Sequence, residues 1–502
     1  MNRSYRKILR NRKQRIERRL QRTNWEAQPC PMFKASNIHY EMAERVGAVN
    51  CGGIGAMHLM VQRLGLVEDM DRHLQLLKVH LPYHESDHVL NLAYNVLAGG
   101  QRLEDLELRR QDEGFMNGLG AQRIPDPTTA GDFTRRFAVE DIMVLQECFN
   151  RARLAVWNMQ PRGFLKEAFV DVDGTIASTY GQCKQGMDIS YKGIWGYAPL
   201  IVSLANTKEV LFLVNRPGNA ASQSGSVEWI DRAVALVKPV AGRVTIRGDT
   251  DFSHTEQLDR WDAQGIKFLV GIDAHPKLVK LAEALGNGAW EPFEREAKYE
   301  ILTEPRPKAF RYREQVVIER KFENKKLVGE ALAEIEYQPH QCCQPYRVII
   351  LRKNISVQKG EKVLFDEVRY FFYITNRKDK PEKIVGLANG RCDQENVIEQ
   401  LKNGVNAMRM PVADLVSNWA YMVMAALAWN LKAWYGLLVP NRERGIELIQ
   451  MEFRGFLHAI LLLPCQIVRT ARRVIYRLLG YNRWLVDFFA TWERLQRLIL
   501  IE

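Results

Sequence analysis

The segment from residue 168 to residue 272 alternates short apolar runs with stretches of helical periodicity, and this pattern restricts the fold more than any other feature of the chain. Apolar, β-branched runs that predict strands cover residues 168–173, 197–204, 210–215, 243–249 and 266–272. Helical spacing of apolar side chains covers residues 227–237 and 254–264. Strands that alternate with helices are typical of an α/β sheet with parallel members. The sequence therefore predicts an α/β core.

Two acidic residues stand at the ends of predicted strands. Asp173 closes the first strand before Gly-Thr, and Asp249 closes the run that begins at Arg243. Reactive groups of open α/β sheets gather at the carboxyl ends of the strands, and a carboxylate there is costly unless it is paired or holds a cation. Either residue could instead cap a helix or form a turn. Asp171 and Asp251, each two residues away on the same face, remain alternatives.

The patterns on either side of this core divide the chain into regions of different character. Residues 25–165 show helical periodicity, and the chain after residue 385 returns to it. The block between them is extended, and its strand candidates are residues 310–320, 332–337, 346–351 and 368–375. We expect a basic arm (1–24), an α-helical domain (25–165), the first part of the core (166–289), a β-rich insertion (290–376), the second part of the core (377–440) and C-terminal basic helices (441–502).

Positive charge is concentrated at the beginning of the chain. The 502 residues include 71 Lys and Arg against 59 Asp and Glu, a net charge of +12, and residues 1–22 alone hold ten basic residues and one acidic residue. A surplus of this kind favours a polyanionic partner. If the arm is helical, its basic residues occur on all sides, which suits DNA phosphates better than a membrane surface that needs an apolar face. A disordered, solubilising tail is the alternative.

The sequence gives no sign of secretion or membrane insertion. The charged start is not followed by an apolar stretch of a signal peptide, and no apolar run has the length of a membrane helix. The eight cysteines form no C-x-x-C pair, which suits a reducing cytoplasm. We expect a cytoplasmic protein.

A third acidic candidate lies in a predicted helix that opens near residue 390. Arg391, Glu395, Glu399 and Lys402 fall at helical spacing and share one face. An exposed helix with ion pairs would explain them. They would equally allow Glu395 to complete a carboxylate triad while Arg391 and Lys402 hold phosphate oxygens. Three oxygen ligands suit Mg²⁺, and two such ions can support an in-line displacement at a phosphodiester.

Four arginines near the C-terminus form a second basic feature. Arg469, Arg472, Arg473 and Arg477 follow one another at helical spacing, with no acidic residue between residues 464 and 481. The pattern predicts a basic stripe on one helix that tracks a DNA backbone. An intramolecular clamp on an acidic surface is the alternative.

Four short motifs resemble those of the DDE transposases of bacterial insertion sequences, in the group numbered thirteen-eighty, which are relatives of piggyBac. The motifs are Asp173-Gly-Thr175, Asn215-Arg-Pro-Gly-Asn219, Arg247-Gly-Asp249-Thr-Asp-Phe252 and Arg391-x3-Glu395-x6-Lys402. The resemblance runs from about residue 40 to about residue 434. One position departs from it, because related enzymes often have Tyr where this chain has Ala388.

The resemblance implies an RNase H-like core with a β domain inserted before the helix that bears the glutamate. It implies that Asp173, Asp249 and Glu395 are the catalytic residues and hold two Mg²⁺ ions, for which Mn²⁺ can substitute. Such enzymes bind the terminal inverted repeats of their own element, cut its ends and join them to target double-stranded DNA, generally as a synaptic homodimer. We therefore predict a DNA transposase that associates with the nucleoid when it is bound to DNA and whose α-helical domain (25–165) serves in DNA binding and dimerisation. The alternatives are an RNase H-like, structure-specific DNA nuclease and a non-catalytic DNA-binding protein derived from a transposase.

Overall fold

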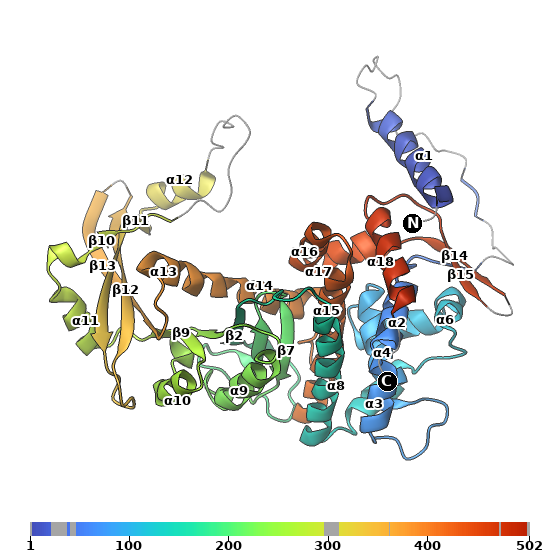
Figure 1. Ribbon diagram of the computed structural model, residues 1–502, viewed down its shortest axis with the longest axis horizontal. Coiled ribbons are helices and arrows are strands. Elements are labelled where there is room, and N and C mark those ends of the chain that lie inside the picture. The colour runs from blue at the N-terminus through green and yellow to red at the C-terminus, as the bar shows by residue number, and fades with distance from the viewer. Residues whose placement is uncertain are drawn as a thin grey trace.

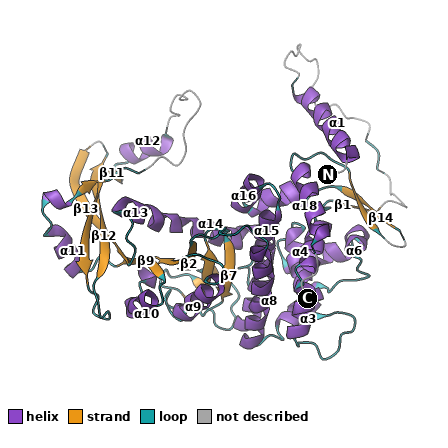
Figure 2. Cartoon of the chain, viewed as in Figure 1, coloured by secondary structure: helices purple, strands orange, loops and turns teal. Residues whose placement is uncertain are grey.

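The computed structural model describes residues 3–21, 38–40, 47–295, 311–360, 362–470 and 473–498 (Figure 1). A nine-stranded mixed sheet occupies one part of the elongated molecule, and a largely helical region occupies the other. The predicted mixed α/β architecture is confirmed. Figure 2 shows how the strands gather at one end and in the middle, whereas helices dominate the other end.

The centre of the sheet is built from the strands that the alternating pattern predicted. β2 (Ala168–Gly174), β8 (Val244–Gly248) and β9 (Lys267–Ile272) are parallel, and β6 (Leu200–Leu204) and β7 (Glu209–Val214) continue the sheet in antiparallel fashion. Every residue of β6, β7 and β8 is buried, which explains why they read as continuous apolar runs. Because β2, β8 and β9 are parallel, their carboxyl ends meet at one edge.

Helices pack against both sides of this central sheet. α9 (Ser226–Val237) contacts β2, β6, β7 and β8, and α10 (Leu258–Ala263) contacts β9. α13 (Pro381–Asn389) and α14 (Asp393–Glu399) lie on the opposite side of the sheet in the view of Figure 1. This helix pair is tied to β2 and β8, at whose carboxyl ends Asp173 and Asp249 lie, by hydrogen bonds between Gln394 and Asp171 and between Arg247 and Leu387.

The extended block does not form a separate sheet. β11 (Glu323–Tyr337), β12 (Tyr346–Lys359) and β13 (Lys362–Thr375) form an antiparallel meander, and β13 pairs with β9, so the block lengthens the central sheet. The short strand β10 (Glu291–Pro292) pairs with the free edge of β11.

The prediction of a strand over residues 310–320 is wrong. These residues include the helix α12 (Tyr312–Glu319), none of whose side chains is buried. β-branched residues favour a strand only where they can pack in a sheet, and this segment is not part of any sheet among the described residues.

Apart from the short strand β1 (Gly47–Val49), the described residues of the region before the core are in helices and loops, as predicted. Its helices are α2 (Ile54–Arg63), α3 (Leu66–His73), α4 (Glu85–Leu97), α5 (Leu106–Arg110), α6 (Glu113–Leu119), α7 (Pro127–Thr134) and α8 (Val139–Asn158). The long helix α15 (Leu415–Leu438) contacts β7 on one side and α4 and α8 on the other, so it joins this region to the sheet. Its buried residues lie on all of its faces, as expected for a helix at the centre of a large core.

The described helices give no candidate for a membrane span, because none combines the necessary length with sufficient apolar character.

The C-terminal region contains a β-hairpin where a basic helix was predicted. α16 (Arg442–Gln450), α17 (Phe453–Phe456) and α18 (Leu485–Arg497) are helical, but β14 (Cys465–Arg469) and β15 (Val474–Leu478) pair in antiparallel fashion. β14 also pairs with β1 (Gly47–Val49).

The prediction of one helix through Arg469, Arg473 and Arg477 is therefore wrong, and Arg472 lies outside the described residues. The physical reason is that Cys465 and Ile467 are buried at alternate positions, which is strand periodicity.

Candidate active site

Asp173 and Asp249 lie at the carboxyl ends of two neighbouring parallel strands. Asp173 is the second-to-last residue of β2, and Asp249 directly follows β8. Asp173 Oδ2 accepts a hydrogen bond from Arg391 Nη1 at 2.9 Å, and Asp249 Oδ2 lies 3.9 Å from Arg391 Nη2. The structure thus brings the two carboxylates together around one guanidinium group.

Each carboxylate also bonds to the local backbone. Asp173 Oδ1 accepts a hydrogen bond from the N–H of Gly174 at 2.8 Å. Asp249 Oδ1 accepts one from the N–H of Asp251 at 3.1 Å and caps the short 3-10 helix η2 (Thr250–Phe252). Asp249 is therefore a helix cap as the sequence allowed, and its second oxygen still faces Arg391.

The electrostatics of the pair indicate a shortage of positive charge. Burial raises the pKa of Asp173 to about 6, and the charge of Asp249 adds to this rise while Arg391 opposes it. Burial likewise raises the pKa of Asp249, again against the effect of Arg391. A single guanidinium does not offset the burial of two carboxylates, so a further cation at this edge would stabilise their ionised forms.

The neighbouring acidic residues have other roles. Asp171 is buried and accepts two hydrogen bonds from Arg247, at 2.6 Å from Nε and 2.8 Å from Nη2. Arg247 Nη1 also donates to the carbonyl oxygen of Leu387 at 2.8 Å, and a β-carbon on Gly390 would lie 2.8 Å from the same Nη1. Asp171 is therefore tied into the interior, where its arginine joins β8, β2 and α13. Asp251 is exposed.

Glu395 lies on α14, four residues after Arg391. Its neighbour Gln394 is buried and donates hydrogen bonds to the carbonyl oxygens of Asp171 and Ile201, both at 3.1 Å, which fixes α14 over β2 and β6. Glu395 itself is exposed. Within the described residues, its carboxylate does not join those of Asp173 and Asp249 in a group of ligand atoms within 4.8 Å.

The segment that carries these residues is helical, but it is not one regular α-helix. Arg391 lies in the 3-10 helix η5 (Gly390–Cys392), Glu395 lies in α14, and Lys402 lies in the π-helix η6 (Gln400–Gly404). The side chain of Gln400 accepts a hydrogen bond from the N–H of Phe453 at 2.9 Å, a contact with a distant segment that sequence spacing does not show. A π-turn changes the angular position of the residues within it, and such turns are frequent at functional sites.

Comparison with known proteins identifies the family. A family model described as "Transposase DDE domain group 1" matches residues 48–500. The chain belongs to this family. No curated protein matches the chain. Among solved structures, it is similar to the "Cryo-EM structure of piggyBac transposase synaptic complex with hairpin DNA (SNHP)", with 10% identity and a TM-score of 0.37 over 83% of this chain and 84% of that chain.

Two lysines add positive charge near α14 in this DDE transposase family member. Burial lowers the pKa of Lys402, and the charge of Lys192 adds to that effect. Lys192 lies in the loop between β4 (Asp188–Ile189) and β5 (Trp195–Tyr197), which form a small sheet with β3 (Ala177–Ser178). The sequence indicated Lys402 but not Lys192, because nothing in the chain between them signals that they come together.

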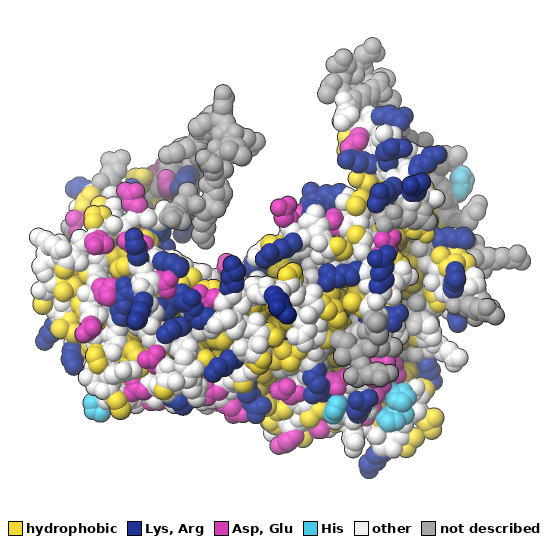
Figure 3. All heavy atoms as spheres, viewed as in Figure 1, with side chains coloured by type: hydrophobic (Ala, Val, Ile, Leu, Met, Phe, Trp, Pro, Cys, Tyr) yellow, Lys and Arg dark blue, Asp and Glu magenta, His cyan; other side chains and the backbone are white. Residues whose placement is uncertain are grey.

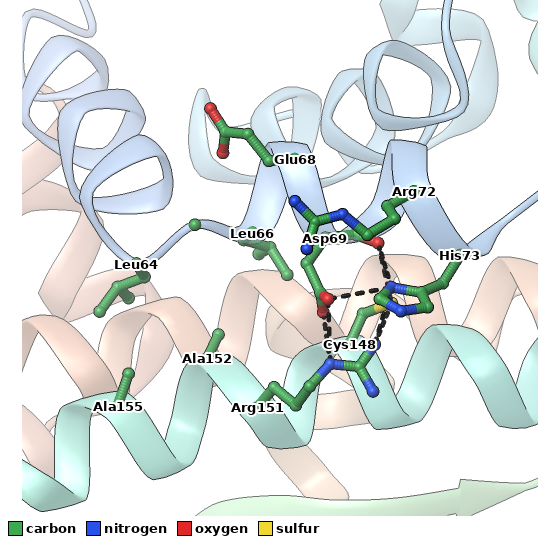
Figure 4. Close-up of a pocket in the computed structure, with 11 residues that line it drawn as sticks. Leu64, Leu66, Glu68, Asp69, Arg72, His73, Cys148, Arg151, Ala152 and Ala155 are labelled. Atoms are coloured by element: carbon green, nitrogen blue, oxygen red, sulfur yellow. Dashed lines mark hydrogen bonds and ion pairs between the residues drawn. The ribbon is translucent and has the colours of Figure 1, made fainter. Parts of the chain in front are cut away.

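The groups of possible metal ligands that the described residues do form lie elsewhere in this transposase. Asp69, His73 and Cys148 meet between α3 and α8, and Figure 4 shows Arg151 reaching the same place. Arg151 donates to Asp69 Oδ2 at 2.8 Å and to Cys148 Sγ at 3.2 Å, so a guanidinium already supplies the positive charge. His80, His84 and Glu85 form the second group, in which Glu85 accepts hydrogen bonds from the N–H groups of Leu76 and Leu77.

The basic arm and the C-terminal hairpin of the transposase lie against each other. α1 (Arg3–Leu20) is a helix whose Arg12 Nη1 donates to the carbonyl oxygens of Leu478 and Gly480, at 3.2 and 2.7 Å. Tyr5 stacks on Phe489 of α18 with ring centroids 5.1 Å apart. Figure 3 shows Lys and Arg side chains over the surface of α1. The arm and the C-terminal region that contains the hairpin, predicted separately, are thus in contact.

Proposed function

We propose that this chain is a DNA transposase that binds the terminal inverted repeats of its insertion sequence, cleaves the ends and joins them to target DNA by Mg²⁺-dependent phosphoryl transfer. The observation that carries the proposal is the convergence of Asp173 and Asp249 on Arg391 at one edge of the sheet. Family membership supports the reaction class. The mixed sheet with parallel strands at its centre supports an RNase H-like core.

The donor set fits divalent cations that prefer oxygen ligands. Asp173 and Asp249 each present a carboxylate with a raised pKa, which marks a place where added positive charge is favourable. Bound Mg²⁺ would activate a water molecule or the 3′-hydroxyl of the DNA as the nucleophile and would stabilise the leaving oxygen. In the proposed complex, Asp173 and Asp249 hold the ions and Glu395, on α14 beside Arg391, completes the triad.

Basic residues have a separate role in this proposal. Arg391 lies between the two aspartates, where it can bind a phosphate oxygen when cations take its place on the carboxylates. Lys402, with Lys192 near it, extends the positive surface along α14 and η6. Arg469, Arg473 and Arg477 on the hairpin, together with α1, are proposed to hold the DNA backbone away from the cleavage position, in a synaptic homodimer.

The test uses DNA ends carrying the inverted repeats that flank the coding region. Asp173→Ala, Asp249→Ala and Glu395→Ala should each reduce Mg²⁺-dependent cleavage by roughly 1,000-fold or more, a barrier increase of about 4 kcal/mol, while end binding persists. Glu399→Ala, one turn further along α14, is the matched control and should cleave normally. Cleavage retained by one of the three variants would remove that residue from the triad.

A second assay separates a transposase from a nuclease with the same active site. Precleaved ends with free 3′-hydroxyl groups are supplied together with target DNA and Mg²⁺. Joining of the two supports the proposal. Cleavage without joining would indicate a structure-specific nuclease, and binding without either reaction would indicate a non-catalytic DNA-binding protein.

A further inference from the structure

Arg216 differs from the other buried arginines of the protein. In the described part of the chain the buried arginines are Arg153, Arg216, Arg247 and Arg377. Arg153, Arg247 and Arg377 each pair with a carboxylate, of Glu209, Asp171 and Glu167 respectively. Arg216 has no ion pair with any described residue, although only 8% of its surface is exposed. A buried charge without a counter-charge is costly, so its retention calls for a reason.

The hydrogen bonds of Arg216 leave one side of its guanidinium free. Nε donates to the carbonyl oxygen of Ala198 at 2.8 Å, and Nη1 donates to those of Ser222 and Ser224, both at 2.8 Å, and of Ala221 at 3.3 Å. These bonds orient the side chain firmly. Nη2 has no acceptor among the described residues, and burial lowers the pKa of Arg216 to about 10 without any carboxylate contributing. The group is therefore positive at neutral pH and holds two unused donors.

The free Nη2 group points toward the edge of the sheet that carries the aspartates. A β-carbon added to Gly174 would lie 3.5 Å from Nη2, so the absence of a side chain at Gly174 leaves that space open. Gly174 directly follows Asp173, and consecutive Cα atoms are about 3.8 Å apart. Arg216 thus presents its free donors one residue away from the proposed cleavage position.

The beginning of α9 lies at the same place. The carbonyl groups that bind Nη1 of Arg216 belong to Ala221, Ser222 and Ser224, in the segment that leads into α9 at Ser226. The N–H of Ser226 donates to the carbonyl oxygen of Gln223 at 3.0 Å, and among the described residues no side chain caps the other amides of the first turn. Glu228, the acidic residue of the first turn, pairs instead with Arg232 at 3.0 Å. The positive end of a helix dipole and unbonded N–H groups favour an anion.

We propose that Nη2 of Arg216 and the N-terminal end of α9 form a phosphate subsite for the DNA strand next to the scissile phosphate. The inference rests on the proposed function for the identity of the ligand. Arg216 would fix the register of the strand, so that the phosphodiester to be cleaved lies at Asp173 and Asp249. The arginine of the motif Asn215-Arg-Pro-Gly-Asn219 would then both bind DNA and stabilise the fold.

The test measures binding of precleaved DNA ends in which single phosphates are replaced by neutral methylphosphonates. In the wild-type protein, neutralising the phosphate at the subsite should weaken binding about tenfold. Arg216→Gln should weaken binding of unmodified DNA to a similar extent and should be insensitive to neutralisation at that position alone. Lys238→Gln, an exposed residue at the other end of α9, is the control and should show the wild-type profile. If Arg216→Gln and the neutralisation of a phosphate weakened binding by independent factors that multiply, whichever phosphate is neutralised, the inference would be overturned.

A second variant covers the case in which Arg216→Gln does not fold. Gly174→Ala keeps all the carbonyl contacts of Arg216 and places a methyl group at ordinary contact distance from Nη2. This variant should have the melting temperature of the wild-type protein, and its binding of DNA should no longer depend on the charge of the phosphate at the subsite. If its binding still showed the wild-type dependence on that phosphate, the proposal of a subsite would be overturned.

The binding readout also keeps two failures apart. If the wild-type protein binds ends but neither cleaves nor joins them, the proposed function fails while the subsite can still be measured. If it cleaves normally and the profile shows no coupling to Arg216, the subsite alone fails.

Discussion

Two aspartate–arginine pairs lie two residues apart on the same strand and the same face, yet they are built differently. Asp171 and Arg247 have side chains only 1% and 5% exposed and share two short hydrogen bonds. Asp173 and Arg391 are 15% and 16% exposed and share one, and Arg391 divides its charge with Asp249. Asp171–Arg247 is here called the inner pair and Asp173–Arg391 the outer pair. The inner pair is shielded from solvent, whereas the outer pair is partly exposed and its partners can be exchanged. Along β2, the inner pair thus has a structural role, whereas the outer pair, two residues further on, lies at a site that can accept another cation.

The largest expected effect comes from breaking the inner pair. Asp171→Ala leaves the Arg247 guanidinium buried without its counter-charge, and loss of one partner of a buried pair costs about 3–5 kcal/mol of unfolding free energy. Urea unfolding followed by circular dichroism measures this loss. A fully stable Asp171→Ala protein would show that the inner pair does not hold the sheet edge together.

Neutralising the outer aspartate should have the opposite sign. The pKa of Asp173 is raised from 3.8 to about 6, so its ionised form is disfavoured in the folded protein. Asp173→Asn should therefore raise the unfolding free energy of the metal-free protein at neutral pH by up to about 3 kcal/mol. The same substitution should abolish cleavage, so stability and activity would separate at this position.

The pH dependence checks the cause of that gain. Because the folded pKa lies above the unfolded value, the ionised Asp173 contributes instability that is absent below pH 3.8 and grows as the pH rises toward about 6. The stability difference between Asp173→Asn and the wild-type protein should accordingly increase from pH 5 to pH 7 and then level off. A difference that does not change over this range would assign the gain to something other than the charge.

The parts of this comparison that the sequence predicted are those set by local burial. β2, β8 and β9 are covered on both faces, so their apolar runs fixed their positions closely. The meeting of Asp173 and Asp249 then followed, because carboxyl ends of parallel strands share an edge. What spacing could not decide was which aspartate, Asp171 or Asp173, belonged to the interior, since that depends on where two distant arginines reach.

The parts that the sequence did not predict depend on contacts between remote segments. The basic residues of the hairpin fit a helical spacing, but β14 pairs with β1, which lies at the other end of the chain. Arg216 and Lys192 lie in loops, where no periodic pattern of side chains indicates a role. The π-turn around Lys402 likewise accompanies a contact between Gln400 and Phe453. Local secondary-structure propensity does not predict any of these contacts.

Removing the shared arginine should loosen the outer pair in favour of metal. Arg391→Gln frees both aspartates from the guanidinium, so we expect Mg²⁺ or Mn²⁺ to bind about tenfold more tightly, equivalent to about 1.4 kcal/mol, as measured by calorimetry. Cleavage should nevertheless fall, because the proposed phosphate contact is lost. Arg391→Lys retains the charge and should lie between the two. Unchanged metal affinity in Arg391→Gln would mean that the guanidinium does not compete for the carboxylates.

The smallest effect is expected at the acidic residue just outside the pair. Asp251 is exposed, and its side chain acts on Asp249 only through its charge, which raises the pKa of that group. Asp251→Asn should change the unfolding free energy by no more than about 0.5 kcal/mol and leave cleavage within about twofold of wild type. Its backbone N–H, which bonds to Asp249, is unaffected by the substitution. A loss of cleavage comparable to that of Asp249→Ala would instead move the metal-binding role from Asp249 to Asp251.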